Sequence, residues 1–397
     1  MFSISRHRRE SRLSIPGAVL IALFSPPVSA ELAIPAWDFE PGLSLRLFYD
    51  DNVRLSSENP QGSFGGIAEA YGLLSHTSEI SEISIRAAVD SSYYADVTEL
   101  DSTDGALDII YAYRMDRVEL GLEAGFVYDS TLTSEEETTG LVQLNKRRSL
   151  FEIRPSMEYE VSERARVGAE VLLQDVSYED VQDIVLSNYQ FLRFGLNGHY
   201  DLSERTALIG RAIYDRYDAE QNADQSETYG AEVGFRYRVS ERMVISGLAG
   251  GRSASATSDS PTQAGSGRST GPIFEFGLER DYEIGSISLG LQRSLLPSGR
   301  GTLLDTTRAN LVIARPITER ATARLRASVF RNRNPGGEVS LNDRDFFLIS
   351  PGVRWRLAES TWVDLSYRFR MQSREVLDTD AESNAVFLGL SHDWAAR

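Results

Sequence analysis

Hydrophobic and polar residues alternate along most of the chain. The stretch 118–129, for example, has Val, Leu, Ala, Phe and Tyr at its even positions and its acidic residues at odd positions. Successive side chains of a β-strand point to opposite faces, so a period of two predicts a strand with one apolar and one polar face. The alternation begins at Gly42 and continues to Trp394. It therefore predicts an all-β protein.

A short turn recurs between these stretches. It reads Tyr159–Arg164, Tyr200–Arg205 and Tyr237–Arg242, each ending in Ser-Glu-Arg, with weaker copies at Pro316–Arg320 and Trp355–Ser360. The spacing of roughly 37 to 41 residues indicates a repeated unit. Tight turns are expected near residues 80, 116, 163, 204, 241, 282, 319 and 359. This series predicts about 18 strands, with tight turns at one end and long loops at the other.

The expected long loops are polar and acidic. They are Asp129–Arg148, Asp175–Asn188, Asp215–Glu227, Arg252–Gly271, Arg331–Arg344 and Gln372–Asn384. Tyr and Trp lie at strand ends beside the tight turns, as in the aromatic girdles of a membrane interface. An open strand edge in hydrocarbon leaves unpaired backbone groups, so a membrane sheet must close. The pattern predicts an antiparallel transmembrane β-barrel with short periplasmic turns and long extracellular loops.

A soluble β-propeller is the competing architecture, because its blades repeat at a similar length. A blade needs four short strands per repeat, whereas each repeat here has two long ones. Two prolines, Pro155 and Pro351, fall inside expected strands, where proline removes a ladder donor. Their matching positions lead us to expect a bulge at each.

The N-terminus has the form of a secretory signal. Arg6, Arg8, Arg9 and Arg12 precede an apolar stretch, and Val28–Ala30 has the small-x-small form of a cleavage site. We therefore expect a signal peptide over 1–30, a short periplasmic segment over 31–41 and the barrel over 42–397. No other stretch is long and apolar enough to predict a membrane helix.

Composition changes this interpretation little. The chain has no cysteine, so no disulfide or thiol metal site is expected. Its formal net charge is −17, and no nucleic-acid partner is expected. Lys146 is its single lysine, so nearly all cations are planar guanidinium groups. No cofactor motif or metal-ligand spacing is present. Ser391, His392 and Asp393 are adjacent in a strand and point to alternate faces, so they form no catalytic triad, and we expect no enzyme.

The polar faces of the expected strands carry charge of different sign in two regions. Strands three to seven contribute mainly acids to the lumen, among them Glu119, Glu123, Glu152, Glu158 and Glu170. Strands fourteen to eighteen contribute mainly arginines, namely Arg308, Arg324, Arg326, Arg354, Arg356, Arg368 and Arg370. In an 18-stranded barrel these two walls face each other. The arginines either bind passing anions or pair with neighbouring acids and fill the lumen, and Asp364 is the one acid close to them in sequence.

The loop Asp129–Arg148, the third long loop along the chain, is the candidate constriction. It carries Glu135, Glu136 and Glu137, followed by Lys146, Arg147 and Arg148. Both signs of charge can therefore reach opposing walls if the loop bends inward. Acidic loops can also hold divalent ions against lipopolysaccharide, although a solvated surface is the simpler interpretation.

The first strand leads into Tyr49-Asp50-Asp51-Asn52-Val53. With the signal peptide and the repeated strand–turn–strand units, this string resembles a family of bacterial outer-membrane β-barrel porins, some of whose members are encoded with exopolysaccharide assembly machinery. Leu388, Leu390 and Trp394 in the last strand are similar to the signal read by the barrel assembly machinery. The resemblance implies an outer-membrane barrel, with outer-membrane lipids, lipopolysaccharide and polysaccharide export components as partners.

Two functions remain open from the sequence. The first is a pore that passes polar, anionic solutes and serves exopolysaccharide export. The second is a structural or adhesion barrel whose lumen is plugged by ion pairs. Conductance separates the two, because a plugged barrel gives none.

Overall fold

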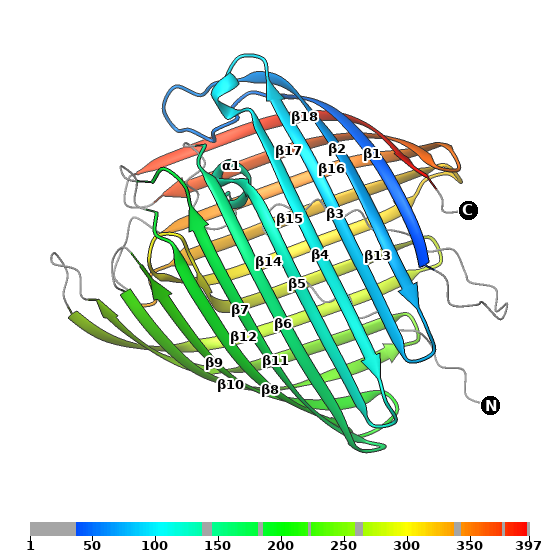
Figure 1. Ribbon diagram of the computed structural model, residues 1–397, viewed down its shortest axis with the longest axis vertical. Coiled ribbons are helices and arrows are strands. Elements are labelled where there is room, and N and C mark those ends of the chain that lie inside the picture. Colours follow the sequence, from blue (N-terminus) through cyan, green and yellow to red (C-terminus); the bar gives the residue numbers. More distant parts are fainter. Residues whose placement is uncertain are drawn as a thin grey trace.

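The computed structural model describes residues 37–136, 145–181, 186–220, 224–258, 265–336, 343–374 and 378–394. These form a single closed sheet of 18 antiparallel strands (Figure 1). The strands β1 to β18 are, in order, Trp37–Asp50, Ser63–Thr77, Ser81–Tyr94, Ser102–Arg114, Val118–Ser130, Arg147–Ser162, Ala165–Tyr178, Tyr189–Asp201, Thr206–Ala219, Asp224–Ser240, Met243–Ser258, Gly265–Tyr282, Gly285–Pro297, Leu303–Pro316, Ala321–Arg333, Arg344–Ala358, Thr361–Arg374 and Thr379–Asp393. A 3-10 turn, η1 (Thr98–Leu100), and a short helix, α1 (Thr131–Ser134), complete the described elements.

The barrel closes between its first and last strands. β1 pairs with β2 along its whole length and with β18 from Gly42↔Asp393 to Asp50↔Ala385. Every strand pairs with the strands before and after it in sequence. Consecutive strands run in opposite directions, so all ladders are antiparallel. The predicted fold class and strand number are confirmed.

The tight turns all lie at one end, together with the start of β1 and the end of β18 (Figure 1). All eight connections fall where the sequence predicted them. The β12–β13 turn uses Gly285 at φ +116°, a backbone conformation that side-chain-bearing residues rarely adopt. We refer to this end as the turn end and to the other as the loop end.

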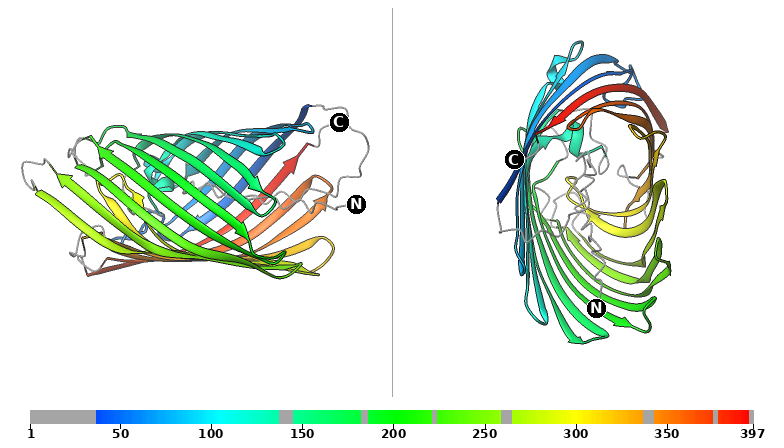
Figure 2. Two further views of the ribbon diagram at one scale, coloured as in Figure 1. Left: turned by 90° about the horizontal axis from the view of Figure 1, so that it is seen from below. Right: turned by 90° about the vertical axis from the view of Figure 1, so that its right-hand side faces the viewer.

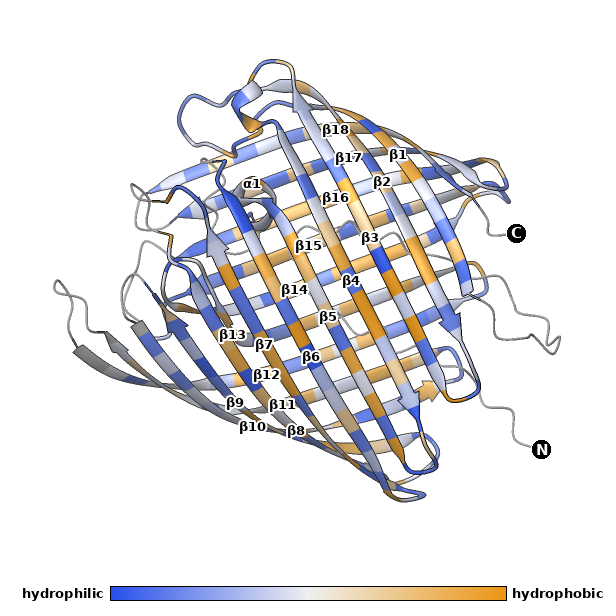
Figure 3. Ribbon diagram, viewed as in Figure 1, coloured by the Kyte–Doolittle hydropathy of each residue, from blue (hydrophilic) through white to orange (hydrophobic). Residues whose placement is uncertain are grey.

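One face of every strand is apolar and exposed. Val233, Leu47 and Phe64 expose 74%, 65% and 64% of their surface, respectively. In Figure 3 the apolar positions alternate with polar ones along each strand. An apolar surface of this extent is stable against hydrocarbon and not against water. The alternation of the sequence thus becomes an apolar exterior and a polar lumen.

The strands run further than the sequence predicted. β1 begins at Trp37, before the expected start at Gly42. The expected loop Asp215–Glu227 is mostly strand, because β9 ends at Ala219 and β10 begins at Asp224. The expected loop Arg252–Gly271 is likewise mostly β11 and β12. These strand ends are mostly polar on both faces, because a strand that extends beyond an apolar belt needs no apolar face. Their composition therefore resembles that of a loop.

The two prolines do not create bulges. Pro155 pairs with Leu122 of β5, and Pro351 pairs with Leu325 of β15. On their other side the β6–β7 and β16–β17 ladders are interrupted at the proline and resume in the same register. The missing proline donor is therefore accommodated by a gap in the ladder, and the expectation of a bulge was wrong.

Three segments at the loop end fold into the lumen. They are the β1–β2 connection, the β5–β6 connection with α1, and the outer part of the β13–β14 hairpin. Figure 2, in the view along the barrel, shows α1 and the yellow β13–β14 hairpin inside the ring of strands. Apolar side chains from these segments pack against inward-facing side chains in two buried clusters. In a third cluster, Val53 of the β1–β2 connection packs on Val97 and Leu100 of the β3–β4 connection. No helix in the described ranges is long and apolar enough to cross a membrane.

Candidate functional site

The charged residues predicted to line the lumen all occur at inward-facing strand positions. They alternate with exposed apolar neighbours, as Glu119 does with Leu120 and Arg354 with Val353. Glu137 of the predicted constriction lies outside the described residues. The two predicted walls belong to β5–β7 and to β14–β17.

The acidic wall is largely neutralised by arginines of its own strands and of the neighbouring β4. Arg154 lies 3.6 Å from Glu123 and 3.1 Å from Glu152. Arg166 lies 3.6 Å from Glu158, and Arg114 lies 3.7 Å from the exposed Glu119. Glu170 is exposed to the lumen. Ion pairs between adjacent strands follow from the register, since directly opposite side chains lie close together.

The arginine wall has more acidic partners than the sequence suggested. Arg354 forms a bidentate pair with Asp364, with N–O distances of 2.7 and 3.1 Å. Arg368 and Arg370 bind a different acid, Asp50 of β1, at 3.1 and 2.8 Å. Asp364 is the acid close to these arginines in sequence, and Asp50 is a further partner that closeness in sequence does not reveal. Asp50 is more than 300 positions away in sequence, and barrel closure brings it beside β17 and β18.

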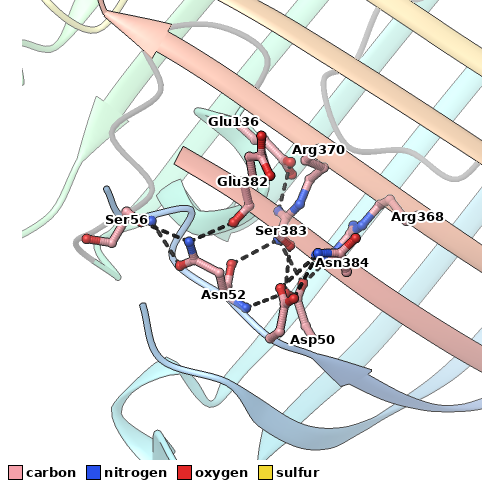
Figure 4. Close-up of polar contacts among 10 residues, drawn as sticks. Asp50, Asn52, Ser56, Glu136, Arg368, Arg370, Glu382, Ser383 and Asn384 are labelled. Atoms are coloured by element: carbon pink, nitrogen blue, oxygen red, sulfur yellow. Dashed lines mark hydrogen bonds and ion pairs between the residues drawn. The ribbon is translucent and has the colours of Figure 1, made fainter. Parts of the chain in front are cut away.

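Asp50 organises a buried polar network at this closure (Figure 4). Its carboxylate accepts hydrogen bonds from the Ser383 hydroxyl at 2.7 Å and from the Asn52 amide at 3.0 Å. The Asn52 side-chain amide donates to the carbonyl oxygens of Ser56 and Glu382, both at 2.8 Å. β1 ends at Asp50, so these contacts hold the β1–β2 connection against the inner wall.

The β5–β6 connection reaches the same network from the opposite side of the lumen. Arg370 donates to the Glu136 carboxylate at 2.8 Å, and Arg344 donates to the Glu136 carbonyl oxygen. Burial raises the pKa of Glu136, but the guanidinium groups of Arg370 and Arg368 more than reverse this and hold the pKa below 4.5. Glu135 is buried and accepts a hydrogen bond from the Tyr178 hydroxyl at 2.6 Å. These contacts fix the segment carrying α1 across the lumen.

The remaining predicted arginines occupy different settings. Among the described residues, no ion pair joins Arg324 or Arg326 to a carboxylate, and Arg326 is exposed to the lumen. Arg308 lies over the Phe330 ring, 4.9 Å from its centroid. Arg356 is exposed near the turn end and donates to the Glu319 carbonyl oxygen at 3.3 Å. Within the described ranges, Arg324 and Arg326 therefore differ from Arg354, Arg368 and Arg370 in having no ion pair with a carboxylate.

On the β16 side, Arg324 and Arg326 lie opposite small residues. Gly352 of β16 lies directly opposite Arg324, and Ser350 lies opposite Arg326. The next strand continues with Ser366 opposite Gly352. On the other side, Arg324 lies opposite Ala314 of β14 and Arg326 lies opposite Val312. Sequence reasoning identified the arginines but not Asp50, Asn52 or Ser383, because only the Tyr49–Val53 string marked that region.

Comparisons with known proteins give distant likenesses of the whole barrel. Neither a sequence family nor a curated protein matches the chain. Among solved structures, OpdK, an outer membrane protein from Pseudomonas aeruginosa, is 12% identical with a TM-score of 0.48, covering 90% of this chain and 99% of its own. OccAB3 from Acinetobacter baumannii is 10% identical with a TM-score of 0.46, at the same coverage. OccK2 from P. aeruginosa, solved with glucuronate, is 10% identical with a TM-score of 0.46 and covers 90% and 96%.

Proposed function

We propose that the protein is a channel of the bacterial outer membrane for polar, anionic solutes. The observation that carries the proposal is the Arg324–Arg326 pair, which faces the lumen without a carboxylate partner among the described residues. The apolar exterior supports the membrane setting, because only a closed sheet satisfies every backbone group in hydrocarbon.

The spacing of the two arginines suits handing over an anion. They are two positions apart on one strand, which places their Cα atoms about 6 to 7 Å apart. Each presents a planar fork of donors that matches a carboxylate, sulfate or phosphate. The residues opposite them on β16, Gly352 and Ser350, are small. A low-dielectric wall strengthens the attraction and raises the local concentration of anions.

The Asp50–Arg370–Glu136 network has a different role in this proposal. Its charges are paired with one another, so it attracts passing ions less than Arg324 and Arg326 do. It holds α1 and the β1–β2 connection across the lumen and narrows the passage. We propose it as the constriction and the Arg324–Arg326 pair as the selective surface. Acidic oligosaccharides are the proposed cargo, and export of an exopolysaccharide is the finer form of this proposal.

The test is the reversal potential of purified protein in planar bilayers under a salt gradient. Changing Arg324 and Arg326 together to glutamine should move the channel from anion towards cation preference. Arg331 and Arg333 are the matched control, because they have the same spacing on the same strand but pair with Asp345 on the outer face. Their double glutamine variant should keep wild-type selectivity. Unchanged selectivity of the Arg324/Arg326 variant would remove the main support for the proposal.

A plugged structural barrel is the second candidate. The buried clusters at the loop end favour it, because they fill part of the lumen with apolar side chains. A protein that gives no conductance, alone or with the inward segments altered, would be a barrel of this kind.

A further inference from the structure

The barrel wall has a seam between β12 and β13 at the loop end. β12 pairs with β11 from Gly265 to Arg280. Its ladder with β13 begins only at Phe274↔Arg293, so residues 265–273 have no ladder partner on that side in the part of the chain that is described. β13 continues beyond the seam by pairing with β14 alone. The outer part of the β13–β14 hairpin has left the wall.

This free part, Ser294–Leu304, is called the gate segment here. Its apex rests on the inner face of the opposite wall. The Ser187 amide donates to the Gly299 carbonyl oxygen at 2.6 Å, and the Tyr217 hydroxyl donates to the Ser298 carbonyl oxygen at 2.8 Å. Leu295 and Leu303 join the buried cluster formed by β5 to β9. The gate segment thus crosses a chord of the lumen and closes that part of the mouth.

An ion-pair latch spans the seam at the base of the gate segment. Asp305 of β14 accepts two hydrogen bonds from Arg293, both at 3.0 Å, and one from Arg252 of β11 at 2.6 Å. Arg252 reaches across β12 at Gly271, where an added Cβ would lie 3.3 Å from its terminal nitrogen. The Arg252 side chain is 2% exposed and Asp305 7%, whereas Arg293 is 34% exposed. One member of the latch is therefore accessible to a solute.

In its position against the wall, the gate segment also buries a charged group, the Arg300 side chain. The Nε atom of Arg300 at its apex is buried and has no hydrogen-bond partner among the described residues. Burial and the charge of Arg374 lower the pKa of Arg300 to about 10, against the opposing charge of Glu135. A charged group that is poorly solvated favours any arrangement that returns it to water. Arg300 thus disfavours the position of the gate segment against the wall, and the Asp305 ion pairs stabilise it.

We propose that Ser294–Leu304 is a gate, held shut by the Asp305 latch and released when an anionic solute competes for Arg293. This inference rests on the proposed anion channel, because the trigger is the cargo itself. A carboxylate or sulfate that binds the guanidinium of Arg293, the most exposed member of the latch, replaces part of the Asp305 bonding. The gate segment then leaves the β7–β9 wall, returns Arg300 to water and widens the mouth.

Asp305→Asn tests the latch, because it keeps the side-chain shape and removes the charge. Asp345→Asn is the matched control, since Asp345 also binds two arginines, Arg331 and Arg333, near the loop end, but on the outer face. In planar bilayers Asp305→Asn should raise open probability without changing ion selectivity, and Asp345→Asn should change neither. Equal open probabilities of the two variants would overturn the gate proposal. The proposed anion channel is tested separately, by whether selectivity depends on Arg324 and Arg326.

A second measurement does not need conductance. The chain has no cysteine, so Ser298→Cys introduces a unique thiol at a position that is 2% exposed. In detergent-purified barrel, a charged maleimide should label this introduced thiol about tenfold faster with Asp305→Asn than with Asp345→Asn, as expected when a local opening becomes more populated. Glucuronate at millimolar concentration should accelerate labelling of the otherwise wild-type Ser298→Cys protein. Equal rates in both variants, or no effect of glucuronate, would overturn the ion-latched gate.

Discussion

Asp50 is the residue on which the loop-end network depends. It is 2% exposed and binds two arginines, one hydroxyl and one backbone amide. A buried carboxylate is stable only when it is paired and hydrogen-bonded, and the same holds for its cationic partners. Removing the charge of Asp50 leaves Arg368 and Arg370 facing each other with Glu136 as the remaining carboxylate.

Asp50→Asn should therefore lower the free energy of unfolding by about 3 to 5 kcal/mol, the usual cost of breaking a buried ion pair from one side. The measurement is urea-induced unfolding in detergent, followed by tryptophan fluorescence. Asp51→Asn is the control, because Asp51 is the next residue and accepts hydrogen bonds from Asn384 in an exposed setting. Equal effects of the two substitutions would contradict a central role for Asp50.

Glu136 gives the constriction a defined pH dependence. Its pKa is held below 4.5 in the docked state, so the released segment binds a proton more readily than the docked one. The Glu136 carboxylate stabilises the contact of its segment with Arg370. This stabilisation is fully present above pH 4.5 and is lost as pH falls through the lowered pKa. Wild-type conductance should stay constant down to about pH 4.5 and rise below it. Glu136→Gln should show the higher conductance already at pH 7, and a pH response identical to wild type would exclude Glu136 as the tether.

At the scale of elements, the sequence predicted strands well and inward segments poorly. The period of two in 118–129 predicts which side chains face the lumen, because successive side chains of a strand point to opposite faces. The inward course of α1 and of the β13–β14 hairpin depends on contacts between residues distant in sequence, such as Tyr217 with Ser298. No local pattern encodes such a contact, so the charges of the Asp129–Arg148 loop predict its inward course, whereas nothing in the sequence predicts that of the hairpin.

Chemistry at the site follows the same division. The arginines of β15 to β17 were found because they alternate with apolar residues on single strands. Their partners were not, because Asp50 reaches Arg370 only through closure of β1 against β18. A charge count along a strand cannot distinguish Arg354, which is paired, from Arg324, which has no carboxylate partner among the described residues. The sequence alone therefore cannot separate the arginines of the proposed constriction from those of the proposed selective surface. That separation depends on which strands the fold places side by side.

At the scale of the whole molecule, the decisive property is the apolar exterior of an edge-free sheet. Leu45 in the middle of β1 is 59% exposed and pairs with Leu390 and Ala68 on the two neighbouring strands. Its neighbour Ser44 faces the lumen and lies opposite Glu69. These adjacent residues point to two different environments, hydrocarbon and water, if the barrel spans a membrane. They give a matched pair for testing the membrane assignment.

Leu45→Arg should destabilise the barrel by about 2 to 4 kcal/mol, the cost of a cation near the middle of a lipid-facing strand, whereas Ser44→Arg should be tolerated beside Glu69. We would fold both variants into lipid vesicles and compare the fraction that migrates as the compact, heat-modifiable form. Wild type and Ser44→Arg should give this form and partition with the outer membrane of expressing cells, while Leu45→Arg should fold poorly. A barrel exposed to water on both faces would accept an arginine equally well at either position, so equal folding of the two variants would mean that the apolar belt does not face lipid.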